Sequence, residues 1–389
     1  MSDGVMLVLI GGRSAIPVTA GALQFLNEVD RVKFLLCDGK DYPSFQENVE
    51  KVLKQERVDL LFDKTTDVKI VNPNKFDDVY ITLAELCKDV EELKLKYVNL
   101  TTAPQTMAFS VYSYVLEKYP DALVFSVNTD QSEITPLVFG KQPIDFNKKL
   151  SVKNYIALCG LNIYKQKSGY EESFESLTQY FVECLETSTK ILYQIRRNAG
   201  GGDSITAPRT FTIKEQDLTK HAISEMQVET FFNKLREAEI IQKFEKSNPT
   251  ISFRVETQDN YAFLAGDWLE FYVYISAKQC GFDSVEMGIE LDNYRGQVDV
   301  FALNNTNAII CECKTGKFDS NDLSRLSSLA EKLGGNYCVK LFITSETQVS
   351  NEHQNQAINY KVRLVSGNDL SNLTEILKKE MKAPTYPRR

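Results

Sequence analysis

The first 145 residues alternate short apolar runs with longer segments whose apolar positions recur at helical spacing. Short apolar runs favour strands, whereas apolar residues three or four positions apart favour an amphipathic helix. The runs predict strands at residues 6–10, 31–37, 58–63, 68–72, 97–100, 122–128 and 134–139. Between them the spacing predicts helices at residues 16–26, 42–56, 79–93 and 104–119. Repeated strand–helix units predict a mostly parallel, doubly wound α/β sheet of the Rossmann-like type.

The middle of the chain has a different pattern. Helical spacing at residues 170–185 and 187–197 is followed by the glycine-rich segment 199–204, which is the clearest linker in the sequence. Two further helices, at 214–219 and 225–239, precede strands at 240–246 and 250–256, which is the order of a winged helix. The second of these helices carries four glutamates and presents a poor face for DNA. We therefore predict a structural adaptor here; the alternative is a nucleic-acid-binding module.

The last third of the chain predicts a second α/β domain. An apolar stretch at residues 266–275 predicts a helix that packs on nearly all sides, and it is followed by two strands at 297–303 and 308–314. The polar residues 304–307 between these strands predict a tight turn. A helix at 320–333 and a strand at 337–344 come next. The chain is thus predicted to comprise a first domain at 1–145, a helical and winged-helix-like connector at 146–254, and a second α/β domain at 255–389.

Composition narrows the class of protein. The formal net charge of −8 argues against broad coating by nucleic acid but leaves room for a local cationic groove. No run approaches the roughly 20 apolar residues of a membrane helix, and the start of the chain has no basic segment typical of a signal peptide. The 8 cysteines lack C-x-x-C spacing and the chain has 2 histidines, so we expect reduced thiols and neither histidine catalysis nor a zinc cluster. A cytoplasmic protein with no membrane partner is predicted.

Two carboxylates and a lysine stand out on the predicted hairpin. If the strands pair from the turn, Asp299 lies directly opposite Glu312, and side-chain alternation places Lys314 on the face of Glu312. Opposed like charges repel, so a divalent cation is expected between them, and hard oxygen ligands suit Mg²⁺ or Mn²⁺. Lys314 would then hold a scissile phosphate or the charge that develops on it. The alternative is an exposed hairpin face with an ordinary Glu–Lys pair.

Glu270 lies upstream, in the apolar stretch that predicts a helix packed on nearly all sides. An ionised glutamate is rarely buried without a partner. Coordination of a metal ion, or orientation of a metal-bound water, would supply one. We therefore predict Glu270 as the third carboxylate of the site; the alternative is a residue at the helix edge that reaches solvent.

Two loops of the first domain are candidates for a ligand site. Ligands of doubly wound sheets lie at the carboxyl ends of the strands, near the switch point. Each of these loops opens a helix, where free N–H groups and the helix dipole favour a phosphate. Glycines allow close approach of the backbone, hydroxyls can donate, and an arginine can pair with phosphate. The predicted ligand-binding residues are Gly11, Gly12, Arg13, Ser14, Thr101, Thr102, Ala103, Pro104, Gln105, Thr106 and Met107.

The second domain resembles a known nuclease core. Asp299 with Glu312-Cys313-Lys314, preceded by a helix carrying Glu270, resembles the PD-(D/E)xK (restriction-endonuclease-like) core over about residues 255–380. The first domain, through the loops at 11–14 and 99–107, resembles a CARF domain (the CRISPR-associated Rossmann fold). The order of the two domains is similar to that of the ancillary nucleases of type III CRISPR systems, and this similarity covers almost the whole chain.

The resemblance implies a metal-dependent endonuclease of antiviral defence. It implies that Asp299, Glu312 and Glu270 bind Mn²⁺ or Mg²⁺, and that Lys314 assists the attacking water or the phosphate. It further implies a homodimer activated by a cyclic oligoadenylate, namely cyclic tetra-adenylate, whose two-fold symmetry suits a C2 dimer. The expected substrate is DNA, RNA or both, in single-stranded form. Two alternatives remain: a ligand-sensing transcriptional regulator with an inactive nuclease fold, and a restriction-type DNase without ligand control.

Overall fold

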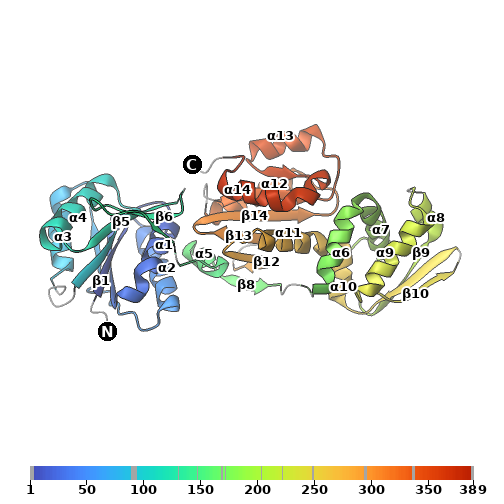
Figure 1. Cartoon of the computed structure of the whole chain (residues 1–389), viewed down its shortest axis with the longest axis horizontal. Coiled ribbons are helices and arrows are strands. Elements are labelled where there is room, and N and C mark those ends of the chain that lie inside the picture. Colours follow the sequence, from blue (N-terminus) through green and yellow to red (C-terminus); the bar gives the residue numbers. More distant parts are fainter. Residues whose placement is uncertain are drawn as a thin grey trace. The chain divides into compact units, whose positions relative to one another are not determined.

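The computed structural model divides the chain into two compact units. The first contains residues 1–163 together with 303–307, and the second contains residues 164–302 and 308–389. Figure 1 shows their elements, coloured by position in the sequence. The residues that the structure describes are 4–88, 94–129, 131–146, 148–167, 170, 172–202, 204–220, 222–247, 249–292, 296–334 and 338–386.

The first unit is built on a seven-stranded sheet in the order β3-β2-β1-β4-β5-β6-β7. The first five strands of this order are parallel to their neighbours, while β6 and β7 pair antiparallel. The chain fills the sheet outward from β1 to β3 and then returns to place β4 on the other side of β1. The switch point of this doubly wound sheet therefore lies between β1 and β4. The strands are β1 Gly4–Ile10, β2 Arg31–Cys37, β3 Val68–Val71, β4 Lys94–Asn99, β5 Leu123–Asn128, β6 Glu133–Pro136 and β7 Ile144–Asp145.

Helices cover both faces of this sheet (Figure 1). On one face α3 and α4 pack on Leu7, Leu35 and Val98 through a continuous apolar cluster. On the other face α1 packs on β1, β4 and β5, and α2 packs beside it on β1 and β2. All seven residues of β1 are buried because the strand is covered on both sides. The helices are α1 Ile16–Phe25, α2 Tyr42–Glu56, α3 Phe76–Leu86, α4 Gln105–Lys118 and α5 Val152–Leu158, and a short 3₁₀ turn, η1, spans Leu26–Glu28.

The predicted strand at 58–63 is wrong. Of this segment only Leu61 forms a β-bridge, to Arg31. The chain instead turns so that Asp67, which is fully buried, forms an ion pair with Lys33 at 3.0 Å. A buried charge needs such a partner. The chain therefore turns to form this ion pair and does not add a strand to the sheet. The predicted helix at 79–93 begins earlier and ends at Leu86, and its residues 89–93 lie outside the described part of the chain.

The second unit is built on a six-stranded sheet in the order β16-β15-β14-β13-β12-β8. Helices α11 and α14 pack on one face through an apolar cluster that includes Cys311 and Cys313, and α12 packs over β15. The strands are β8 Ile163–Gln166, β12 Ser284–Leu291, β13 Gln297–Asn304, β14 Asn307–Lys314, β15 Cys338–Thr344 and β16 Arg363–Val365. The helices are α10 Gln258–Ala262, α11 Trp268–Gln279, α12 Ser320–Lys332, α13 Asn351–Asn359 and α14 Leu373–Lys382, with turns η2 at Phe263–Asp267 and η4 at Gly367–Asn372.

Most of the predicted connector, from residue 164 to 254, folds as part of this second unit, whereas residues 146–163 belong to the first. The expected helices and the two expected strands are present, and a strand that the sequence pattern did not predict, β9, completes a three-stranded sheet in the order β10-β11-β9. Phe181 of α6 stacks on Phe231 of α9 and meets the edge of Trp268 at the start of α11. One aromatic core therefore joins the connector to the six-stranded sheet. The elements are α6 Glu172–Glu183, α7 Leu185–Asn198, β9 Arg209–Lys214, α8 Glu215–Thr219, α9 Glu225–Glu237, β10 Gln242–Ser247 and β11 Thr250–Val255.

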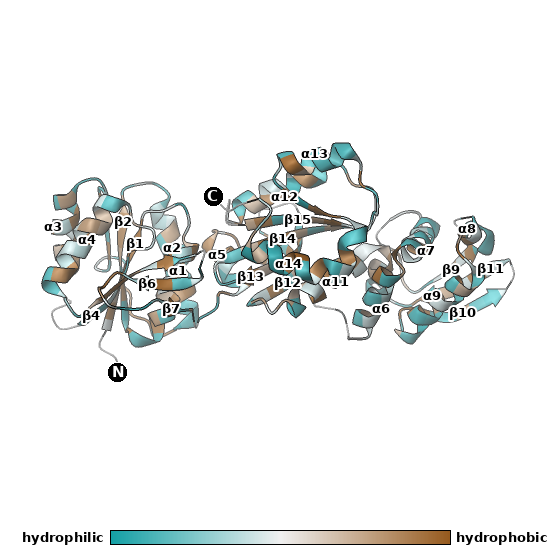
Figure 2. Cartoon of the chain, turned by 45° about the horizontal axis from the view of Figure 1, so that its top comes forward, coloured by the Kyte–Doolittle hydropathy of each residue, from teal (hydrophilic) through white to brown (hydrophobic). Residues whose placement is uncertain are grey.

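The hydropathy of the chain follows this layering. In Figure 2 the strands of both large sheets are predominantly hydrophobic, and the helices carry their hydrophilic residues on the outer sides. In the part of the chain that the structure describes, no helix combines the length and the apolar character that crossing a membrane requires.

Candidate functional site

The hairpin of β13 and β14 carries the core of the site. Its turn at Asn305 and Thr306 is the predicted one, and Asn305 has φ 56, a left-handed conformation that asparagine tolerates better than most residues. Asp299 turns its carboxylate toward the neighbouring strand, where Oδ2 accepts a hydrogen bond from the amide of Cys313 at 2.7 Å. That bond fixes Asp299 beside the Glu312–Lys314 segment, as the predicted hairpin requires.

Asp299 and Glu312 are both buried, at 8% and 5% exposure. Burial raises the pKa of the Asp299 carboxyl well above its usual range, and the charges of Glu270 and Glu312 raise it further. Burial likewise raises the pKa of Glu312, although the guanidinium of Arg325 opposes the shift. Two carboxylates that repel in a desolvated place do not suit an ordinary exposed hairpin face. The buried position contradicts that alternative reading.

Glu270 joins the same cluster from α11. Its Oε2 accepts a hydrogen bond from Gln297 Nε2 at 3.3 Å, and the same amide lies 3.5 Å from Asp299 Oδ1. The side chain is 14% exposed, so it does not reach into solvent from a helix edge. Burial raises the pKa of Glu270 to about 7, although the ammonium of Lys167 opposes this shift. The structure thus brings Glu270, Asp299 and Glu312 together.

The start of α11 is irregular. The turn at Phe263–Asp267 is wider than an α-helical turn, and the backbone of Gly266 departs from helical angles there. Such widened turns are frequent at functional sites because they redirect neighbouring side chains. Here the turn leads directly into the segment that presents Asp267 and Glu270.

Helix α12 supplies counter-charges to the other side of the cluster. Arg325 forms an ion pair with Glu312. Lys314 Nζ lies 3.4 Å from Asp322 Oδ1, one turn earlier on the same helix. Because α12 contacts both Glu312 and Lys314, these two side chains share a face of β14, as strand alternation predicts.

Lys167 supplies the counter-charge for Glu270. Its Nζ lies 3.1 Å from Glu270 Oε2 and 2.8 Å from Asp267 Oδ2. Tyr170 donates a hydrogen bond to the same Asp267 oxygen at 2.9 Å. Lys167 follows β8, the edge strand of the six-stranded sheet. A residue near the start of the predicted connector therefore completes a site built by residues that come after the connector.

Sequence reasoning missed four residues of this cluster. Gln297 and Arg325 left a readable signal, because Gln297 shares the strand face of Asp299 and Arg325 lies one turn beyond Asp322 on an amphipathic helix. Asp267 also left a signal, because it stands three residues before Glu270. Lys167 left none, because only the folded sheet brings β8 beside the strands that follow the connector.

The chemistry of the cluster fits a divalent metal ion. Its donors are hard carboxylate oxygens, and the close approach of their charges is the penalty that such a cation removes. Among the described residues no group of three acidic, histidine or cysteine side chains is arranged to hold a metal. The reason is visible in the contacts: Glu270 is turned toward Lys167 and Glu312 toward Arg325.

The two predicted ligand loops meet at the switch point of the first sheet. The loop at 11–14 follows β1 and the loop at 101–104 follows β4, which are adjacent strands. A Cβ on Gly11 would lie 2.6 Å from Pro104 Cδ, and one on Gly12 would lie 2.9 Å from Thr102 Cβ. Gly11 and Gly12 therefore lie closer to the side chains of Pro104 and Thr102 than any other residue type would allow.

Side chains within these loops have distinct roles. Arg13 is exposed and forms no ion pair with any carboxylate in the described part of the chain. Ser14 Oγ accepts a hydrogen bond from the amide of Ile16 at the start of α1, and Thr102 Oγ1 donates to the carbonyl of Leu9. Met107 is fully buried and lies 3.6 Å from Cys37 Sγ. The side chain of Met107 therefore belongs to the core and not to the loop surface that the sequence assigned to it.

Together these features define a chain with a doubly wound Rossmann-like domain followed by an α/β domain that holds a buried carboxylate cluster. Residues 257–383 match the family model described as the Card1-like endonuclease domain. Glu270, Asp299, Glu312 and Lys314 all lie within this segment. The match confirms the predicted nuclease domain. No curated protein sequence matches the chain.

Solved structures share the fold along the chain. Protein VC1899 from Vibrio cholerae has a TM-score of 0.76 at 15% identity, covering 99% of this chain and 100% of that one. Can2 from Sulfobacillus thermosulfidooxidans, solved in complex with cyclic tetra-adenylate, has a TM-score of 0.69 at 16% identity, covering 98% and 100%. A type III CRISPR defence DNA nuclease activated by cyclic oligoadenylate has a TM-score of 0.53 at 15% identity, covering 87% of this chain and 45% of that one. These likenesses confirm the predicted fold class.

The position of Lys167 leads to a prediction about stability. Lys167→Met should lower the free energy of unfolding by about 1–3 kcal/mol at about pH 8, because it leaves buried carboxylates without their cation. Removing the ammonium raises the folded-state pKa of Glu270 further above its unfolded value, so stability is lost as pH rises. The loss should therefore be smaller at about pH 5, where Glu270 is protonated. Urea unfolding at both pH values measures it.

The matched control is Lys165→Met, two residues earlier, on β8. The side chain of Lys165 is 67% exposed and lies 3.5 Å from Glu290, so its removal should cost less than about 0.5 kcal/mol at either pH. Equal losses for the two variants would contradict the assigned role of Lys167.

Proposed function

We propose that the chain is a metal-dependent nuclease that hydrolyses phosphodiester bonds of DNA, RNA or both, and that a cyclic oligoadenylate activates it. One observation carries the catalytic part of the proposal: the carboxylate cluster of Glu270, Asp299 and Glu312 lies within the segment that matches an endonuclease domain. Clusters of this kind are characteristic of functional sites because a purely structural site would avoid their cost.

In this proposal Asp299, Glu312 and Glu270 hold Mg²⁺ or Mn²⁺. When bound, such an ion polarises the phosphoryl oxygen and lowers the pKa of a bound water. The amide of Cys313 and the side chain of Gln297 hold the carboxylate of Asp299 in one orientation. Lys314 is only partly buried, so its ammonium is available to contact the scissile phosphate. Asp322, at 3.4 Å, holds that ammonium in position.

The same contacts favour a nuclease over the regulator alternative. A transcriptional regulator with an inactive nuclease fold would gain stability by replacing the buried carboxylates with apolar residues. The winged-helix-like element gives little support to a DNA-binding role. Its helix α9 carries an exposed glutamate, Glu225, that pairs with Lys246 of β10, and its apolar face is taken up by the shared aromatic core. We infer that it is an adaptor.

The first unit is proposed to be the sensor. Its switch-point edge offers the exposed Arg13 and closely packed glycines, which suit a phosphodiester backbone. Can2, which has the same fold, was solved with cyclic tetra-adenylate, and this supports the same class of ligand here. The three proposed regions remain residues 1–145 for the sensor, 146–254 for the connector and 255–389 for the nuclease.

A homodimer through the sensor is also proposed. Helices α3 and α4 expose several large apolar side chains: Phe76 at 42%, Ile81 at 60%, Phe109 at 66% and Leu116 at 47%. An apolar surface of this kind on a soluble domain marks an interaction site. A second copy is the occupant that a two-fold symmetric cyclic tetranucleotide would require.

The first test concerns catalysis. Glu312→Gln should lower the cleavage rate by at least about a hundredfold, because the amide keeps the shape of the side chain but loses the charge that holds the metal. Cleavage of labelled DNA and RNA with Mn²⁺ measures the rate, and chelation with EDTA should abolish cleavage by the parent. Glu331→Gln, an exposed change on α12, should leave the rate unchanged. Near-normal cleavage by purified Glu312→Gln protein would overturn the metal site.

The second test concerns activation. Arg13→Ala should weaken binding of cyclic tetra-adenylate about tenfold or more, because a charged hydrogen bond to phosphate is lost. The cleavage rate at saturating activator should stay near that of the parent. Calorimetry and cleavage on the same preparations measure both. Lys118→Ala at the far end of α4 is the control, and fast cleavage by the parent without any cyclic nucleotide would leave an unregulated nuclease.

The third test concerns assembly. Phe109→Asp combined with Leu116→Asp should convert a dimer into a monomer, because two charges would be buried in an apolar interface. Light scattering after size-exclusion chromatography measures the mass. Val58→Asp, which changes an 89% exposed residue away from these helices, should leave the mass unchanged. A parent that is monomeric with and without cyclic tetra-adenylate would contradict the dimer.

A further inference from the structure

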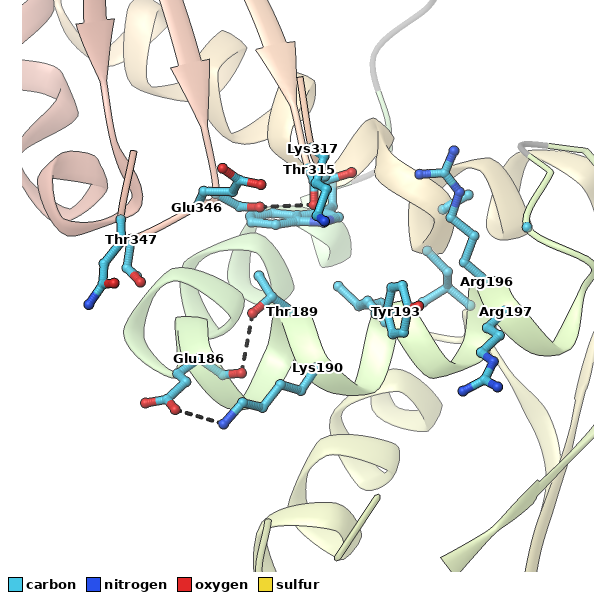
Figure 3. A pocket seen from close by; sticks show the side chains of 18 of the residues that line it. Glu186, Thr189, Lys190, Tyr193, Arg196, Arg197, Thr315, Lys317, Glu346 and Thr347 are labelled. Carbon is cyan, nitrogen blue, oxygen red and sulfur yellow. Dashed lines mark hydrogen bonds and ion pairs between the residues drawn. The ribbon is translucent and has the colours of Figure 1, made fainter. Parts of the chain in front are cut away.

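The second unit contains an open groove of about 1240 Å³ beside the carboxylate cluster. Helix α7 forms one wall, and the loops that follow β14 and β15 form the other. Figure 3 shows Lys190, Tyr193 and Arg196 along the helix, with Thr315, Lys317 and Glu346 on the opposite side. Both walls belong to the unit that shares one apolar core, so the groove is part of a single folded body.

Residues that line the groove are close neighbours in sequence of the proposed catalytic residues. Thr315 lines it and directly follows Lys314, while Trp268 lines its floor two residues before Glu270. The carbonyl of Lys314 accepts a hydrogen bond from the amide of Ser345, and Ser345 Oγ donates to the carbonyl of Thr315. These bonds fix the two loops to each other. A polymer cut at the carboxylate cluster would therefore continue along this groove.

The charge of the groove suits a polyanion. Its lining contains four cationic side chains, Lys190, Arg196, Arg197 and Lys317, against two carboxylates, Glu186 and Glu346. Lys190 forms an ion pair with Glu186 at 2.7 Å. The chain as a whole has a formal net charge of −8, so this excess of positive charge is a local feature and not an average property of the surface.

Tyr193 adds a surface for a base. It is 59% exposed, although it lies in the wall of the groove. It stands three residues from both Lys190 and Arg196, so it neighbours each of them on the surface of α7. An aromatic ring placed between cations matches the pattern by which proteins hold an unpaired strand: the ring stacks on a base while the cations contact the flanking phosphates.

Two glycines of the predicted linker, Gly200 and Gly201, line the groove at the end of α7. Gly200 and Gly201 have φ 94 and 81, and the amide of Gly201 donates to the carbonyl of Arg196 at 2.9 Å. These angles favour glycine over every other residue type. These two glycines therefore cap α7 and add no side chain of their own to the groove.

We propose that this groove is a nucleotide-binding subsite that holds the strand next to the scissile phosphate. Tyr193 stacks on an unpaired base, and Arg196 and Lys317 contact the neighbouring phosphates. The proposal rests on the proposed nuclease function, and it assigns to α7 of the connector a direct role in holding substrate. A paired duplex does not offer Tyr193 a free base face, so the subsite selects an unpaired strand.

The test is a binding measurement in protein that does not cleave. With Glu312→Gln as the parent, fluorescence anisotropy follows binding of a fluorescein-labelled oligothymidine and of an abasic oligonucleotide of the same length. Tyr193→Ala should weaken binding of oligothymidine about tenfold or more, whereas Tyr193→Phe keeps the ring and should bind within about twofold of the parent. The abasic strand should bind the parent and Tyr193→Ala equally.

Tyr164→Ala is the matched control, because Tyr164 is a 75% exposed tyrosine on β8 that does not line the groove. It should bind oligothymidine like the parent. Arg196→Gln and Lys317→Gln should each reduce the dependence of log K on log salt by about 0.7, the value expected for one lost phosphate contact on a single strand. Lys118→Gln in the first unit should leave that slope unchanged.

The outcomes separate this proposal from the proposed function. Equal binding of oligothymidine by Tyr193→Ala, Tyr164→Ala and the parent would overturn the subsite, even where the cleavage tests uphold the nuclease. An equal loss on the abasic strand would also overturn it, because stacking could not be the cause. Binding that depends on Tyr193, in a protein that cleaves nothing with any metal, would uphold the subsite and refute the nuclease.

Discussion

Three carboxylates lie desolvated at one end of a sheet, and much of the second unit is arranged around that fact. Ionised groups in such a place cost several kcal/mol each unless positive charge or hydrogen bonds offset the loss of water. The offset here is assembled from separate parts of the chain. Lys167 comes from the edge strand, Arg325 from α12, and the amide of Cys313 from the hairpin itself. Disturbing any one of these elements would change the charge balance at all three carboxylates.

This dependence explains why the connector and the proposed nuclease share one core. Lys167 reaches Glu270 only if β8 pairs at the sheet edge, and the helices that follow β8 must then pack against α11. The stacking of Phe181 on Phe231 and its edge contact with Trp268 provide that packing. The same contacts hold α7 beside the strand ends, so the groove and the carboxylate cluster keep fixed positions relative to each other.

The parts of the site that the sequence predicted are those governed by short-range rules. Asp299, Glu312 and Lys314 follow from strand alternation across one tight turn, and Glu270 follows from the rarity of a buried acid in an apolar helix. The switch-point loops follow from the strand–helix alternation. Lys167 could not be predicted, because its place depends on which strand pairs at a sheet edge. The strand expected at 58–63 was wrong because a buried ion pair outweighed the local pattern. Met107, expected in a ligand loop, packs its side chain in the core.

The edge position of β8 has a consequence for how the chain can be divided. The segment that matches the endonuclease family begins at residue 257, yet the sheet it forms is closed on one side by residues 163–166. A fragment cut at the family boundary would expose β12 as an unpaired edge, together with the aromatic surface that α6 normally covers. Unprotected edges of this kind recruit strands from other molecules. The smallest part of the chain expected to remain dispersed in solution therefore starts before β8, well upstream of the point where sequence similarity begins.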